Sequence, residues 1–173
     1  MNVKFLNPFV DAAHDILSLE THQPVQRGEL RLEAGAYQTD DVTVIISLVG
    51  AVDGTVFYSM SKEVAVGLAS VLMGEKFDAL DRLAQSGIAE LGNVITGQAS
   101  MKLAAAGFES NISTPSLILG KGASISTLEF PRLIVPLVTY IGPMTIHLAL
   151  REGLQPNLKT PQLGIPKVDL LNR

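Results

Sequence analysis

Apolar residues recur every three or four positions in three stretches of the chain: residues 7–20, the segment between Ser61 and Gly74, and residues 77–106. This spacing places the apolar side chains on one face and predicts three amphipathic helices. Ser61 is in the position of an N-cap, with Glu63 in the following turn, and Gly74 is where a C-terminal glycine usually stands. The second helix is therefore bounded by signals at both ends.

Runs rich in β-branched residues lie between and after these helices. Residues 42–60 contain two such runs around Ala51-Val52-Asp53-Gly54, and an Asp-Gly pair between such runs predicts a β-hairpin. Residues 133–150 carry no formal charge, but the central pair Gly142-Pro143 interrupts them. We therefore expect two buried strands joined by a turn there, and no membrane-spanning helix.

The order of helix, strands, two helices and strands predicts an α+β fold in two layers, with helices covering a mainly antiparallel sheet. A chain of 173 residues suits one domain, which we place at residues 1–152. Residues 153–173 show neither helical nor strand periodicity, contain three prolines, and are interpreted as a C-terminal tail.

The longest predicted helix has two distinct faces. At about 100° per residue, one stripe is apolar and faces the core: Ala84, Ile88, Leu91, Ile95 and Ala99. On the opposite side, Glu90 and Asn93 are three residues apart, so their side chains lie one above the other on a surface that faces solvent. Small residues surround the pair and form a low platform that we interpret as a docking surface: Ser86, Ala89, Gly97 and Ser100.

Two features indicate that this face is more than a solvated surface. Glu90 has no Lys or Arg three or four positions away, so it does not form a routine ion pair within the helix. Gly97 lowers the stability of the helix by about 1 kcal/mol relative to alanine, and no local benefit offsets this loss. Gly92 lies nearer the buried side and is explained by close packing. A single carboxylate and an amide make an incomplete active site, so we expect a partner to supply a cation and an activated group. Phosphoryl transfer suits this arrangement, because much of its catalysis is the positioning of a water molecule.

Composition excludes several other classes of function. Hydrophobic residues make up 47% of the chain and charged residues 17%, which is typical of a compact globular protein. The net charge of −4 indicates no nucleic-acid partner, and the absence of cysteine excludes disulfides and Cys-ligated metals. His14, His22 and His147 are far apart and show no metal-ligand spacing. The N-terminus does not resemble a signal peptide, and we expect a cytoplasmic protein that does not span a membrane.

The stretch SGIAELGNVITGQA, residues 86–99, resembles the signature helix of the CheC/CheX/FliY phosphatases, and of their CheX-like members in particular. Residues 49–74 are similar to the hairpin and following helix of that family. Residues 112–122 and 134–150 resemble its later strands. The similarity follows the family order from about Phe5 to Glu152.

This resemblance implies a fold, an activity and a partner. The fold would be the CheC-like one, and the activity would be hydrolysis of the aspartyl-phosphate on a CheY-like response-regulator receiver domain, as in chemotaxis. The resemblance assigns to Glu90 a salt bridge with the active-site Lys of the receiver. Asn93 would enter the receiver's active site and orient the attacking water. No cofactor would be bound by this chain, because Mg²⁺ would be held by the receiver.

CheC-like members often carry a second Glu-x-x-Asn on a pseudo-symmetric helix. The first predicted helix has Asp11-Ala12-Ala13-His14 instead. The resemblance therefore implies one site per chain in a homodimer, as in CheX-like members. A second interpretation stays open at this point, in which the chain is a non-catalytic adaptor that binds a receiver or a flagellar switch component through the same helix face.

Overall fold

The structure is a computed structural model and describes residues 3–127 and 130–153. The helical elements are a 3₁₀ turn, η1, and three α-helices: η1 Val3–Phe5, α1 Leu6–Thr21, α2 Lys62–Met73 and α3 Arg82–Ala105. The strands are β1 Gln26–Arg27, β2 Arg31–Glu33, β3 Tyr37–Gln38, β4 Val42–Gly50, β5 Val52–Met60, β6 Ser110–Ile112, β7 Ser116–Leu119, β8 Ser124–Ile125, β9 Arg132–Val138 and β10 Pro143–Glu152. The predicted tail lies outside the described residues except for Gly153.

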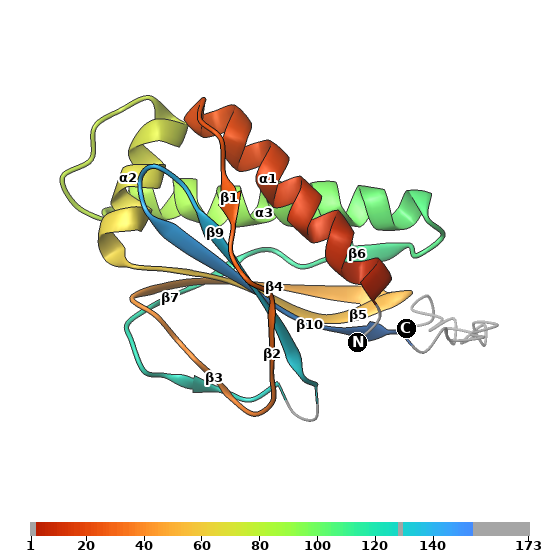
Figure 1. The fold of residues 1–173 in the computed structure, drawn as a ribbon. Coiled ribbons are helices and arrows are strands. Elements are labelled where there is room, and N and C mark those ends of the chain that lie inside the picture. Colours follow the sequence, from red (N-terminus) through yellow and green to blue (C-terminus); the bar gives the residue numbers. More distant parts are fainter. Residues whose placement is uncertain (1–2, 128–129, 154–173) are drawn as a thin grey trace, which may run out of the picture.

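Eight of these strands form one antiparallel sheet in the order β1-β9-β10-β5-β4-β6, with β2 also pairing with β9 and β7 with β4. The three α-helices cover one face of this sheet, and a small ladder of β3 and β8 lies on the other side (Figure 1). The predicted α+β class, with helices covering an antiparallel sheet, is confirmed. The β3–β8 ladder adds a small layer beyond the two that were predicted.

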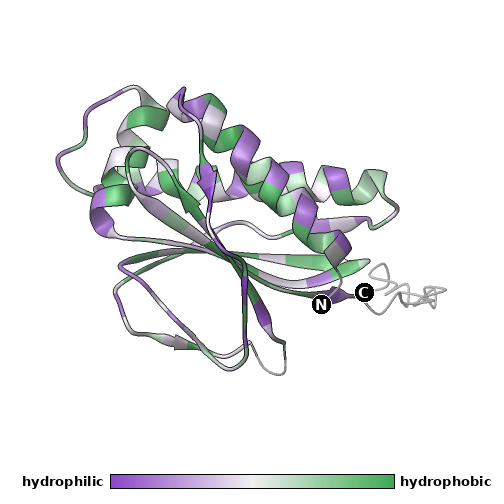
Figure 2. Cartoon of the chain, in the orientation of Figure 1, coloured by the Kyte–Doolittle hydropathy of each residue, from purple (hydrophilic) through white to green (hydrophobic). Residues whose placement is uncertain are grey.

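The main hydrophobic core lies between the helices and the sheet. Its largest fully buried side chains include Phe9 and Leu17 of α1, Ile88 and Ile95 of α3, and Tyr58 of β5. Figure 2 shows how hydrophilic and hydrophobic residues alternate around the helices, as the amphipathic spacing predicted. Burial of the apolar face of α3 holds the helix against the sheet and leaves the opposite face of α3 available for contacts with a partner.

The predicted first hairpin forms, and its turn lies at the first residue of the segment Ala51-Val52-Asp53-Gly54, not at Asp53-Gly54. Strands β4 and β5 are paired from Val42 with Met60 to Leu48 with Gly54, so the chain turns around Ala51 and Asp53-Gly54 belongs to β5. Gly54 is needed because β10 approaches closely there. A Cβ at this position would overlap the Ala149 carbonyl oxygen, and its φ of 140° is one that other residues rarely adopt.

The helix boundaries follow local capping groups. The Ser61 hydroxyl accepts a hydrogen bond from the Val64 N–H at 3.2 Å, and Gly74 ends α2 with a φ of 63°, both as predicted. The long helix begins later than predicted, because the Asp81 carboxylate accepts from the Ala84 N–H at 2.9 Å and defines its N-terminus. Residues 77–81 form the connection to α2 instead.

The segment 133–150 forms strands, as predicted. Strands β9 and β10 pair from Pro143 with Val138 to Leu148 with Leu133, around a turn in which Thr139 N–H and Gly142 N–H each donate to the other residue's carbonyl. Within the described residues, none of the helices is long and apolar enough to span a membrane.

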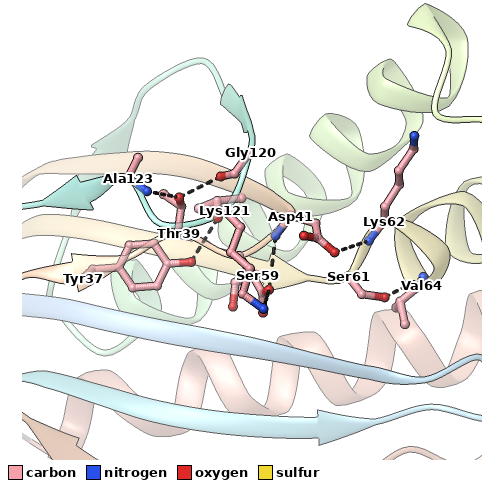
Figure 3. Close-up of polar contacts among 12 residues, drawn as sticks. Tyr37, Thr39, Asp41, Ser59, Ser61, Lys62, Val64, Gly120, Lys121 and Ala123 are labelled. Atoms are coloured by element: carbon pink, nitrogen blue, oxygen red, sulfur yellow. Dashed lines mark hydrogen bonds and ion pairs between the residues drawn. The ribbon is translucent and has the colours of Figure 1, made fainter.

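Side chains near the start of α2 attach neighbouring loops to the sheet (Figure 3). The Thr39 hydroxyl donates to the Gly120 carbonyl at 2.8 Å and accepts from the Ala123 N–H at 2.9 Å. Next to it, the Asp41 carboxylate accepts from the Lys62 N–H at 3.3 Å. These bonds connect the β7–β8 loop and the first turn of α2 to the same end of β4.

On the sheet face away from the helices, His147 lies in a half-buried polar cluster. Its Nε2 is 3.3 Å from the Ser59 hydroxyl, its Nδ1 is 3.5 Å from Arg132 Nη1, and its ring packs against Tyr37 at a centroid distance of 4.7 Å. Burial first, and then the charges of Arg132 and Arg31, lower the pKa of His147 to about 4. The imidazole is therefore neutral at pH 7, with Nδ1 able to accept from the guanidinium.

This lowered pKa predicts an acid-sensitive contribution to stability. Between about pH 6.5 and pH 4, the unfolded chain binds a proton at His147 that the folded chain does not, so the free energy of unfolding falls as the pH is lowered. Over this pH range, we expect the free energy of unfolding of His147→Gln to fall by about 2 kcal/mol less than that of the wild type. The figure is kept moderate because the ring of His147 is not fully buried. Urea unfolding of both proteins near pH 7 and pH 4.5 measures the difference, and equal losses in the two would contradict the prediction.

Candidate functional site

Helix α3 presents the candidate site and buries its other face. The predicted core stripe is confirmed, since all five of its residues are buried: Ala84, Ile88, Leu91, Ile95 and Ala99. Glu90 is exposed and Asn93 is half-buried on the other side of the helix. The Asn93 Nδ2 donates to the Glu90 carboxylate at 3.4 Å, which is long for a hydrogen bond, so the two side chains hold each other only weakly.

Both side chains retain capacity for a partner. None of the ion pairs among the described residues involves Glu90. The Asn93 amide oxygen accepts no hydrogen bond within the part of the chain that the structure describes. The arrangement thus offers, three residues apart on the helix, a carboxylate with no ion pair and an amide oxygen with no hydrogen-bond donor among the described residues.

The predicted platform is only partly open. Ser86 is exposed, and Ala89 and Gly97 are half-buried. A docking role for Ser100 stays a prediction, but the residue is half-buried and its hydroxyl donates to the Ser110 carbonyl of β6 at 3.0 Å. The reason is tertiary, since β6 runs beside the second half of α3 and the side chain of its Ile112 reaches toward Gly97.

Sequence reasoning missed the apolar residues on the exposed face. Leu83, Val94 and Met101 are all exposed on α3, each within about 40° of Glu90 around the helix. Helical spacing alone places these three residues on the same face as Glu90, but the face was interpreted only from its polar and small residues. The surface around Glu90 is therefore mixed, with apolar side chains beside the carboxylate.

A buried hydrogen-bond network positions the turn that carries Asn93. The Thr96 hydroxyl donates to the Gly92 carbonyl at 2.7 Å and therefore accepts from the Tyr58 hydroxyl, also at 2.7 Å. Tyr58 lies on β5 and is fully buried, and that burial raises the pKa of its phenol well above the usual value. The network connects the centre of the sheet to the backbone next to Asn93.

Gly92 sets the distance between α3 and the sheet. A Cβ there would lie 3.0 Å from Val44 Cγ1 and 3.3 Å from Tyr58 Cδ2, closer than ordinary packing allows. The predicted role of Gly92 in close packing is confirmed. Among the described residues, no three His, Asp or Glu side chains gather as a metal-binding group.

The sequence profile of the chemotaxis phosphatase CheX family matches residues 42–137, more than half of the chain. The chain belongs to this family. It is 26% identical over 160 residues to the CheY-P phosphatase CheX of Thermotoga maritima, a match that covers 88% of this chain and 99% of the relative.

Solved CheX structures share the fold. The CheX in the crystal structure of the CheX–CheY–BeF₃–Mg²⁺ complex from Borrelia burgdorferi is 30% identical, with a TM-score of 0.74 over 87% of this chain and 100% of that chain. The chemotaxis protein CheX of Vibrio vulnificus is 25% identical, with a TM-score of 0.75 over 85% of this chain and 99% of that chain. The resemblance inferred from the sequence is confirmed.

Gly92 and Gly97 of α3 predict opposite effects of the same substitution. Gly92→Ala should lower the free energy of unfolding by about 1–3 kcal/mol, because the added methyl group pushes α3 away from Val44 and Tyr58. Gly97→Ala should raise it by up to about 1 kcal/mol, since its Cβ would meet only Ile112 Cδ1, at 3.9 Å. Urea unfolding of both variants measures these changes, and a stabilising Gly92→Ala would contradict the packing argument.

Proposed function

We propose that this member of the CheX family hydrolyses the aspartyl-phosphate of a CheY-like receiver domain. The observation that carries the proposal is the pair on the outer face of α3, with Glu90 exposed and Asn93 half-buried. Among the described residues, Glu90 forms no ion pair and the Asn93 amide oxygen accepts no hydrogen bond. The Thermotoga maritima relative is named a CheY-P phosphatase, and the Borrelia burgdorferi structure contains CheX with CheY. Both support a phosphorylated receiver as the substrate.

In this proposal Asn93 orients the attacking water. Its amide oxygen accepts a hydrogen bond from the water and holds the water oxygen in line with the phosphorus. The new bond forms between that oxygen and phosphorus while the bond from phosphorus to the aspartate oxygen breaks. The products are inorganic phosphate, which keeps the protons of the water, and the free aspartate carboxylate. Because a carboxylate is a good leaving group, positioning of the water accounts for most of the proposed catalysis. A general base on this chain is therefore not required.

Glu90 is assigned a docking role. Its carboxylate would pair with the active-site Lys of the receiver and thereby place Asn93 over the phosphoryl group. Lacking an ion pair within the described residues, Glu90 gives up no internal contact of that kind to form this one. Mg²⁺ is assigned to the receiver, and no residue of this chain is proposed as its ligand.

The resemblance also implies a homodimer with one site in each chain. Light scattering should then give a molar mass of twice the 18.4 kDa of one chain.

The adaptor interpretation assigns the same binding surface as the phosphatase proposal but predicts no hydrolysis. In it, the face around Glu90 and Asn93 binds a receiver or a flagellar switch component without hydrolysis. Phosphate release by the wild-type protein separates the two, because only a phosphatase accelerates it.

Substitution of the two residues should separate chemistry from docking. Asn93→Ala should reduce dephosphorylation to the receiver's own rate while leaving affinity for the receiver nearly unchanged, because only the water-orienting group is lost. Glu90→Ala should in addition weaken receiver binding by about tenfold or more, since an ion pair is lost. Phosphate release and titration with receiver activated by beryllofluoride and Mg²⁺ measure the two effects.

Asn111→Ala and Glu109→Ala are matched controls, because both residues are exposed and lie outside α3. Both should behave as wild type. Equal rates of phosphate release with wild type, Asn93→Ala and buffer, for every CheY-like receiver of the source organism, would leave the adaptor interpretation in place of the phosphatase.

A further inference from the structure

A groove opens beside Glu90 where the three helices meet. It has a volume of about 180 Å³, and its apolar walls come from Ile16 of α1, Leu72 and Met73 of α2, and Val94 of α3. Small-molecule pockets usually measure about 300–1,000 Å³. The groove is therefore too small for a typical ligand and suits a single side chain.

Apolar surface remains uncovered at the groove. The exposed fractions are 43% for Met73 and 40% for Val94, and both residues line the groove next to the carboxylate of Glu90. Apolar surface gathered beside a polar functional group is typical of a protein interaction site. The groove is also continuous with the proposed receiver-docking face, since Glu90 belongs to both.

Gly87 shapes the groove. A Cβ at this position would lie 3.3 Å from Met73 Cγ and 3.4 Å from Met73 Sδ. The missing side chain lets Met73 lie against α3 and form one wall of the groove. The packing of Met73 explains why a glycine stands here, although glycine within a helix lowers its stability by about 1 kcal/mol relative to alanine.

The charges at the groove indicate what flanks the bound side chain. Glu20 of α1 and Glu90 of α3 both line it, and no ion pair among the described residues involves either carboxylate. Two unpaired carboxylates around an apolar groove are complementary to an apolar side chain with basic neighbours.

We propose that this groove binds one apolar side chain of the receiver domain, with a basic residue of the receiver beside Glu20. The inference rests on the proposed function for the identity of the partner, and it adds a specificity element outside the Glu90–Asn93 pair. In this arrangement the groove determines which receivers dock productively, while Asn93 determines turnover after docking.

The test replaces Val94 by serine, which keeps the helix surface but removes apolar area from the groove. We expect Val94→Ser to raise both the KM for phosphorylated receiver and the Kd for receiver activated by beryllofluoride and Mg²⁺ by about fivefold to tenfold, with kcat unchanged within about twofold. Glu20→Gln should raise the same Kd by about twofold to fivefold at low salt. That difference should disappear at high salt, because screening removes the attraction.

Val49→Ser is the matched control, since Val49 is a valine with an exposed fraction of 65% on β4, remote from the groove. It should leave KM and Kd as in wild type. An unchanged Kd in Val94→Ser, an equal effect of Val49→Ser, or a loss of kcat alone would overturn the groove proposal. So would a change in the molar mass of Val94→Ser by light scattering, because the occupant would then be a second copy of this chain.

The binding measurement distinguishes failure of the groove from failure of the proposed function. If wild type binds an activated receiver but does not accelerate its dephosphorylation, the phosphatase proposal fails and the Kd of Val94→Ser still decides the groove. If wild type binds none of the CheY-like receivers of the source organism, the groove proposal is overturned with the partner on which it rests.

Discussion

The site depends on the close contact between α3 and the sheet at Gly92. Val44 and Tyr58 occupy the space that a side chain at this position would need, so the helix lies directly on strands β4 and β5. The hydrogen bonds from Tyr58 through Thr96 to the Gly92 carbonyl hold the same turn from inside the core. Because Asn93 is the next residue, this close and hydrogen-bonded contact is adjacent to the residue assigned to orient water, which is the support that precise positioning requires.

Helix α3 combines a structural and a functional face. Its apolar stripe is buried in the main core, while Glu90 and the exposed apolar residues remain outside. The burial of one stripe stabilises the helix whatever the other stripe contains. The outer face can therefore keep a glycine and a carboxylate that forms no ion pair within the described part of the chain. A proposed active site that is completed by a partner can be built on such a face, since it needs only a few side chains held at fixed separations.

Sequence reasoning predicted much of the site because helical geometry is local. The separation of Glu90 and Asn93, the buried stripe beneath them and the packing role of Gly92 all follow from residue spacing on one helix, and the structure agrees with each. Spacing did not predict that β6 passes beside the helix and takes the Ser100 hydroxyl, or that α1 and α2 form a groove next to Glu90. Those contacts join residues far apart in the sequence, and periodicity within one element carries no information about them.

The same division applies to the fold. The sequence by itself determined the α+β class, the three helices, the caps at Ser61 and Gly74 and the strand nature of residues 133–150, because propensity, capping and periodicity act within a few residues. Only the tertiary structure decided that Asp53-Gly54 lies within a strand. There the preference of Asp-Gly for a turn is overridden by the pairing of β5 with both β4 and β10, and the close approach of Ala149 makes glycine necessary. Short-range preferences thus selected the elements, whereas contacts between distant strands and helices set the register of the sheet and the surroundings of Glu90.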